Sequence, residues 1–123
     1  MTLKIIDRNF TVCKVADYSE VNPGSPFVFT AATDQENSLV CPTELTPENV
    51  TAREDGWKAL RIEGVLDFSL VGILAGISAA LADNSIGIFA VSTFNTDYIL
   101  LKENNLENAV KVLAEAGYTV SKQ

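Results

Sequence analysis

Val65-Leu66-Asp67-Phe68-Ser69-Leu70-Val71 is the stretch that decides the fold, because a version of it occurs twice. Fifty residues earlier stands Val15-Ala16-Asp17-Tyr18-Ser19-Glu20-Val21, which has the same Asp–aromatic–Ser centre. At an offset of sixty, further apolar and threonine positions match: Val28-Phe29 with Ile88-Phe89, Thr33 with Thr93, Leu39-Val40 with Ile99-Leu100, and Val50 with Val110. A duplicated unit of about sixty residues is the simplest explanation, and chance similarity between short apolar strands is the alternative.

The second copy predicts the order strand, helix, strand, strand, helix, strand. Alternating residues mark a strand at 57–64, and apolar residues at helical spacing mark a helix at 70–81. Two apolar strands follow at 86–92 and 98–101, then a helix that Asn104 can cap and Gly117 ends, and a closing strand at 118–120. This βαββαβ order predicts an α+β, ferredoxin-like fold, with an antiparallel sheet and both helices on one face.

The first copy has the same order with losses. Its strands are expected at 3–15, 27–33 and 38–41, and Asn22-Pro23-Gly24-Ser25-Pro26 stands where the second copy has its first helix. Thr46-Pro47-Glu48 can begin a short helical turn. Residues 52–56 are the expected junction, so the predicted units are 1–55 and 56–123. Each unit is too small to bury much core alone, so the two are expected to pack together.

Composition excludes several classes of function. A net charge of −7, with nine scattered basic residues among 123, argues against a nucleic-acid partner. Histidine is absent, which removes the commonest general base, the Ser–His and Cys–His nucleophile pairs and histidine-ligated metals. No Gly-rich phosphate loop is present, since Gly72 and Gly76 fall inside a predicted helix. We therefore expect no catalysis, no cofactor and no metal.

The expected compartment is the cytoplasm. Cys13 and Cys41 lie inside apolar stretches and are predicted to be buried thiols rather than a redox pair. Met1-Thr2-Leu3-Lys4 lacks the apolar segment of a signal peptide, and residues 66–81 are too short and too interrupted to span a bilayer. A membrane location is not expected.

The first candidate site is Asp67-Phe68-Ser69, at a predicted strand-to-helix junction. Free backbone N–H groups and the helix dipole make such a junction suitable for a carboxylate or a phosphate. The alternative is that Asp67 or Ser69 only caps the helix, and the residues alone favour that alternative.

The second candidate is the turn Ser92-Thr93-Phe94-Asn95-Thr96-Asp97, which is polar between two apolar strands. It forms either a rim of donors and acceptors beside the helix start or an ordinary hairpin turn stabilised by its own side chains. Its length favours the hairpin turn. Asp67 and Asp97 can lie near each other, where a carboxylate suits the binding of an ammonium group more than proton transfer.

Three segments carry a resemblance to a known family: Gly56–Gly64, Leu66–Leu74 and Ile88–Tyr98, and Ser38-Leu39-Val40-Cys41-Pro42 matches its N-terminal half. They resemble small bacterial ACT-domain proteins that are related to the animal cytosolic arginine sensors of the TOR pathway. The resemblance implies two ACT-like units in tandem, a degenerate one at 1–55 and an ACT domain at 56–123. It covers nearly the whole chain.

The resemblance also implies a small effector, usually an amino acid, bound at an interface between units. The positions that match the family's site are Leu66, Asp67, Phe68, Ser69, Leu70, Val71 and Gly72, with Ser92, Thr93, Phe94, Asn95, Thr96 and Asp97 opposite. The helix start would take the α-carboxylate and Asp67 or Asp97 the α-ammonium. The animal sensors carry four ACT units, so a two-unit chain is expected to form a homodimer. Their preference for arginine is not carried over.

Two rival functions differ from an effector-binding sensor. The first is a structural interaction module, whose sheet edge recruits a protein partner and whose pocket is filled by side chains. The second, and the least expected, is an enzyme of an unrecognised type, because no activated nucleophile or ligand cluster is evident.

Overall fold

The computed structural model describes residues 1–64 and 72–123, which fall into two compact units. Met1–Asp7 and Lys58–Gln123 form one unit, which we call the helical unit, and Arg8–Trp57 form the other, which we call the inserted unit. The chain passes from one to the other at residues 57 and 58, close to the predicted division at 55 and 56. The first seven residues, however, are grouped with the C-terminal part of the chain.

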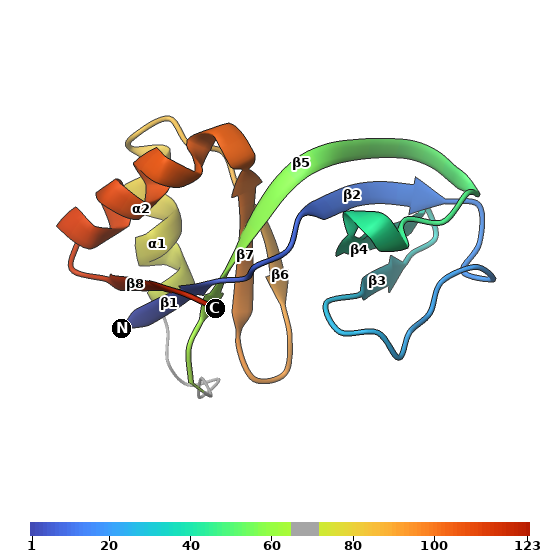
Figure 1. The fold of residues 1–123 in the computed structure, drawn as a ribbon, viewed down its shortest axis with the longest axis horizontal. Coiled ribbons are helices and arrows are strands. Elements are labelled where there is room, and N and C mark those ends of the chain that lie inside the picture. Colours follow the sequence, from blue (N-terminus) through green and yellow to red (C-terminus); the bar gives the residue numbers. More distant parts are fainter. Residues whose placement is uncertain (65–71) are drawn as a thin grey trace. The chain divides into compact units, whose positions relative to one another are not determined.

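The helical unit follows the predicted βαββαβ order, and the α+β fold class is confirmed (Figure 1). Its elements are the end of β5 (Val50–Ile62), α1 (Ile73–Ala82), β6 (Phe89–Ser92), β7 (Asp97–Lys102), a 3-10 turn (Glu103–Asn105), α2 (Leu106–Glu115) and β8 (Thr119–Lys122). A further strand, β1 (Thr2–Ile5), comes from the start of the chain. The sheet order is β6-β7-β5-β1-β8.

Strand β1 occupies the position between β5 and the closing strand β8. It pairs antiparallel with β5, where Leu3 stands opposite Ile62, and parallel with β8, where Leu3 stands opposite Val120. One parallel pair is therefore present beside the antiparallel pairs that the sequence predicts. The N-terminal segment that contributes β1 to this sheet lies more than fifty residues before the rest of the helical unit in the sequence.

Both helices pack into one core with the strands of the helical unit. Leu3, Leu60, Ile62, Ile99 and Leu101 from the strands and Ile77, Leu81, Ala109 and Leu113 from the helices have no exposed surface, and all belong to one cluster. The predicted stripes at 73–81 and 106–113 therefore face the sheet. Since α1 and α2 share this core, the prediction that both helices cover one face is confirmed.

Helix α2 ends as predicted but begins differently. Gly117 has a φ of 98°, its N–H donates to the Ala114 carbonyl at 3.1 Å, and the Tyr118 N–H donates to the Leu113 carbonyl at 3.0 Å. These two bonds form a Schellman motif, which needs a left-handed residue after the helix. The N-cap is Asn105 without a side-chain hydrogen bond, so the expected cap by Asn104 is wrong, because a 3-10 turn precedes the helix.

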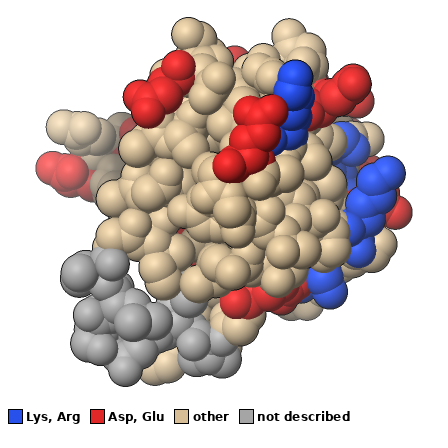
Figure 2. All heavy atoms as spheres, turned by 90° about the vertical axis from the view of Figure 1, so that its left-hand side faces the viewer, with Lys and Arg blue, Asp and Glu red and all other residues tan. Residues whose placement is uncertain are grey.

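The outer side of α1 is uncharged, whereas α2 exposes Glu107, Lys111 and Glu115. Helix α1 contains no charged residue, and Ala75, Gly76 and Ala79 are exposed on it. Figure 2 shows charged side chains around a broad uncharged area on this side. Each helix has ten residues, about half of what a bilayer crossing requires, and no helix of the described chain is long and apolar enough to make one.

The inserted unit repeats the second half of the helical unit at an offset of sixty residues. Strands β3 (Phe29–Ala32) and β4 (Asn37–Pro42) and a 3-10 turn (Thr43–Leu45) correspond to β6, β7 and the turn at 103–105. The Thr33 N–H donates to the Glu36 carbonyl at 2.9 Å, as the Thr93 N–H does to the Thr96 carbonyl at 2.8 Å. The same turn at the same offset supports the duplication over chance similarity.

The inserted unit lacks the first helix of the repeat, as predicted. Its sheet order is β3-β4-β2-β5, with β2 spanning Phe10–Val15, and residues 16–28 contain no helix. In the helical unit, Ile88, Ile99 and Leu101 pack in the core to which α1 contributes Ile77 and Leu81. Their counterparts Val28, Leu39 and Cys41 line a hollow of about 110 Å³ instead. The missing helix therefore accounts for the smaller core of this unit.

Two local predictions in the inserted unit can be compared with its backbone. The expected junction at 52–56 is part of β5, next to the change of unit at residues 57 and 58, and Gly56 has a φ of 86° at a β-bulge where the register with β2 shifts. At Thr46-Pro47-Glu48 no helix forms: Thr46 is extended, with a ψ of 123°, after a 3-10 turn at 43–45, and residues 48–49 form only a turn. A residue that precedes proline is kept out of the helical region by the proline ring.

Both cysteines are buried thiols, as predicted, with 4% of Cys13 and 1% of Cys41 exposed. They lie on neighbouring strands, where Cys13 stands opposite Leu39 and Cys41 opposite Thr11. Burial raises the pKa of the Cys13 thiol from 9.0 to about 11, with a smaller contribution from Cys41, and burial also raises the pKa of Cys41. Both thiols are therefore poor nucleophiles at neutral pH.

We expect the free energy of unfolding to fall as the pH rises from about 9 to about 11. Above pH 9 the unfolded chain loses the Cys13 proton while the folded chain keeps it, so deprotonation favours unfolding. The measurement is urea denaturation at several pH values in this range. Cys13→Ala should flatten the dependence and leave the part due to Cys41, whose pKa is also raised. An equal slope in this variant would contradict the assignment to Cys13.

Candidate functional site

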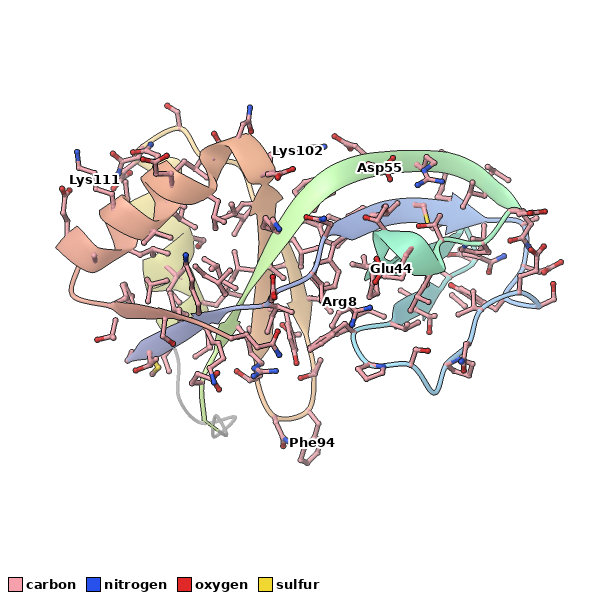
Figure 3. The ribbon with its side chains drawn as sticks, viewed as in Figure 1. Arg8, Glu44, Asp55, Phe94, Lys102 and Lys111 are labelled. Carbon is pink, nitrogen blue, oxygen red and sulfur yellow. The ribbon has the colours of Figure 1, made fainter. Side chains whose placement is uncertain are left out.

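The turn between β6 and β7 is held by its own threonines. Both the N–H and the Oγ1 of Thr93 donate to the Thr96 carbonyl, at 2.8 and 2.9 Å, and Ser92 pairs with Asp97 where the strands begin. Phe94 stands at the tip of the turn, with 81% of its surface exposed (Figure 3). The backbone of residues 92–97 thus forms a hairpin turn stabilised by its own side chains, as the second interpretation of this segment predicts.

Thr96 links this turn to the end of β5. Its side chain is 8% exposed, and its Oγ1 donates to the Ile62 carbonyl at 2.6 Å. Ile62 lies three residues before the segment 65–71. The counterpart of Thr96 in the inserted unit is Glu36, which is exposed. The buried hydroxyl is therefore a feature of the helical unit. Its hydrogen bond joins the turn at 92–97 to the strand that precedes residues 65–71.

Charged side chains surround the same end of β5. Glu63 accepts from Lys4 at 3.4 Å and from Arg61 at 3.4 Å, and the Arg61 guanidinium lies 5.9 Å from the centre of the Tyr98 ring. Hydrogen bonding to Tyr98, together with Glu63, raises the pKa of Arg61 above its usual value. Arg61 and Glu63 are two residues apart on a strand and so share a face. This spacing is the signal that the sequence analysis did not use.

The predicted site residues fall into two groups. Leu66, Asp67, Phe68, Ser69, Leu70 and Val71 lie outside the described residues. Gly72 is the N-cap of α1, with a φ of 87° and no side-chain hydrogen bond to the helix. Ser92, Thr93, Phe94 and Asn95 are exposed, Thr96 is buried and Asp97 is half-buried. The described part of the site is therefore one turn, with Ser92–Asn95 exposed, and the helix start at Gly72.

The first copy of the Asp–aromatic–Ser triplet forms a local turn. The Asp17 carboxylate accepts from the Ser19 N–H at 3.0 Å and from the Ser19 Oγ at 2.5 Å, and the Tyr18 hydroxyl donates to the Ser38 carbonyl at 2.8 Å. The Ser19 hydroxyl, with the Ser19 N–H, lowers the pKa of Asp17. At residues 17–19 no helix follows, and the Asp and Ser side chains bond to each other within the turn instead of capping a helix. Among residues 1–64 and 72–123, no three side chains of His, Cys, Asp or Glu form a metal-binding group.

Comparison with known proteins gives one family and several relatives. A family model of the ACT domain matches residues 52–115. The human protein CASTOR3P is 30% identical over 103 residues, which are 78% of this chain and 59% of that protein, so the chain spans about three-fifths of this relative. A solved structure of a protein from Agrobacterium tumefaciens has 32% identity and a TM-score of 0.88, covering 99% of this chain and 92% of that one.

A more distant structure has the same fold. The regulatory subunit of aspartate kinase from Thermus thermophilus has a TM-score of 0.59 at 10% identity, covering 89% of this chain and 93% of that subunit. At this level of identity the similarity concerns the fold alone.

Proposed function

The chain belongs to the ACT-domain family, and from this membership we propose that it binds a small amino acid or a related metabolite and regulates without catalysis. The ACT family is a regulatory one. The proposed site joins Leu66–Gly72 to the turn Ser92–Asp97 at an interface between ACT units, in a cytoplasmic homodimer. Binding would favour one packing of the units, which a protein partner would then recognise.

One observation carries this proposal: the hydrogen bond from Thr96 to Ile62 ties the polar turn to the strand that leads into residues 65–71. At the other end of that segment the N-cap of α1 is Gly72, which has no side chain that could cap the helix, and the N–H groups of a helix start suit a carboxylate. Asp97 is half-buried at the first residue of β7, where a carboxylate suits an α-ammonium group. The α-carboxylate and the α-ammonium of an amino acid thus each have a complementary group in the proposed site.

A homodimer is supported by the edges of the sheet in the helical unit. In the described chain β6 pairs with β7 alone, and β8 is the last strand on the other side. Strand edges carry unpaired backbone groups that can pair with a second chain. Sedimentation equilibrium tests this part of the proposal, and a monomer at micromolar concentration would contradict it.

We expect one amino acid or a related group to raise the melting temperature. A ligand that binds only the folded chain adds about 2.7 kcal/mol at a hundredfold excess over Kd, or roughly 10 °C for a chain of this size. The measurement is a thermal-shift screen against the twenty amino acids and common polyamines. The double variant Asp67→Ala/Ser69→Ala should lose the shift of the ligand that binds at this site, while its own melting temperature and the shift of any ligand bound elsewhere on the chain stay near those of the parent.

Two results of this screen would change the interpretation. An unchanged shift in the double variant would contradict the proposed site. A screen without any shift would favour the rival function, a structural module that binds a protein through a sheet edge.

A further inference from the structure

A second hollow, of about 280 Å³, lies in the helical unit. Four parts of the helical unit form its walls: the end of β1 with the two residues after it, β5, the start of α2, and the end of β8. The lining residues are Ile5, Ile6, Asp7, Lys58, Leu106, Lys122 and Gln123. Lys58 lines this hollow, whereas Ile62 accepts the hydrogen bond from Thr96 at the site proposed above. The two residues are four apart on β5, which corresponds to a rise of about 13 Å, so the hollow is distinct from that site.

Backbone and side-chain hydrogen bonds hold the rim of this hollow in place. Ile5 pairs with Lys122 in the parallel register, and the Gln123 N–H donates to the Ile5 carbonyl at 2.9 Å. The Asp7 N–H donates to the Gln123 Oε1 at 2.8 Å. The residues after β1 and the end of β8 are thus fixed relative to each other. The walls are in place without a ligand.

The charges around the hollow are unusual for this chain. The sequence has sixteen acidic and nine basic residues, and Lys4, Arg8, Arg53 and Arg61 are paired with carboxylates. Within the described ranges, Lys58 and Lys122 make no ion pair, although both line the same hollow. The two ammonium groups of the lining outnumber its one carboxylate, that of Asp7, so the lining carries a net positive charge that attracts an anion. The hollow therefore favours an anionic ligand.

The remaining lining residues define the class of ligand. Asp7 adds one carboxylate, and Ile5, Ile6 and Leu106 add an apolar wall. A ligand that complements two ammonium groups, one carboxylate and a short apolar wall carries two carboxylates, one ammonium and a short methylene chain. The volume lies near the lower limit of about 300 Å³ for small-molecule sites, as suits such a metabolite. We propose that this hollow binds an acidic amino acid, glutamate or aspartate.

The test is isothermal titration of the full chain with L-glutamate and L-aspartate. Lys58→Met and Lys122→Met each keep the length of the side chain and remove its charge, and each should weaken binding by roughly tenfold or more. Lys111→Met is the matched control, since Lys111 stands on the outer side of α2, away from the hollow (Figure 3). This control should bind like the parent. Equal affinity in the parent and in both Met variants would overturn the proposal.

Two further titrations assign the groups of the ligand. Succinate has both carboxylates but no ammonium, and glutamine has one carboxylate, so both should bind more weakly than glutamate. Asp7→Asn should weaken glutamate relative to succinate, because it removes the partner of the ammonium group and also one negative charge that repels both ligands. The double variant Asp67→Ala/Ser69→Ala should bind glutamate with the affinity of the parent. Loss of glutamate binding there would assign it to the other site and overturn this proposal, as would the absence of glutamate binding at millimolar concentration.

Discussion

Leu3→Ala is expected to lower the free energy of unfolding of the helical unit by about 3–5 kcal/mol. Leu3 has no exposed surface and belongs to the core that α1 and α2 share. It stands opposite Ile62 on one side and Val120 on the other, so the cavity would open in the middle of the sheet, where strand pairing limits relaxation. Urea denaturation followed by circular dichroism gives the free energy.

Leu45→Ala is the matched control, because the same atoms are removed from a side chain that is 39% exposed in the inserted unit. It should cost less than about 1 kcal/mol. A similarly small loss for Leu3→Ala would mean that β1 contributes little to the core of the helical unit. In that case residues 56–123 alone should fold, as the predicted boundary at 55 and 56 implies.

Thr96→Val is expected to cost about 1–3 kcal/mol. Valine has nearly the shape of threonine but no hydroxyl, so the Ile62 carbonyl loses a buried donor at 2.6 Å without a change of volume. The loss should also loosen the contact between the turn at 93–96 and the end of β5. The measurement is the free energy of unfolding together with the thermal shift produced by the effector.

Thr96→Ser is the control for this variant, because it keeps the hydroxyl and removes one methyl group. It should recover most of the effector response even where some stability is lost. If Thr96→Val and the parent respond equally to the effector, the hydrogen bond to Ile62 is structural only, and the observation that supports the proposed site fails.

The local patterns of the second copy predicted its elements correctly. Apolar spacing gave the helical stripe that contains Ile77 and Leu81, and Gly117 marked the end of α2 through its left-handed conformation. The resemblance of three segments to the ACT family is confirmed by the family match at 52–115. These features depend on residues within a few turns of one another, and such short-range information is what a sequence pattern contains.

The pairing of β1 was not predictable in the same way. Thr2 pairs with Thr119, over a hundred residues away. No short pattern shows that residues 2–5 pair there instead of forming one strand with β2 in the N-terminal unit. The sequence also did not show that the expected junction at 52–56 continues a strand, because a glycine with a positive φ occurs in a β-bulge as well as in a turn. The role of Thr96 was missed because a threonine in a turn gives no sign of its burial.

The nesting of the inserted unit within the helical unit also sets the order in which a nascent chain can fold. Every strand of the inserted unit has left the ribosome once residue 57 has done so, and its sheet can form at once. Strand β1 is made first, but its partner β8 is made more than a hundred residues later, roughly 5–20 s at usual rates of synthesis. Until then, the apolar side chain of Leu3 is without its final surroundings and is a natural target for chaperones that hold nascent chains.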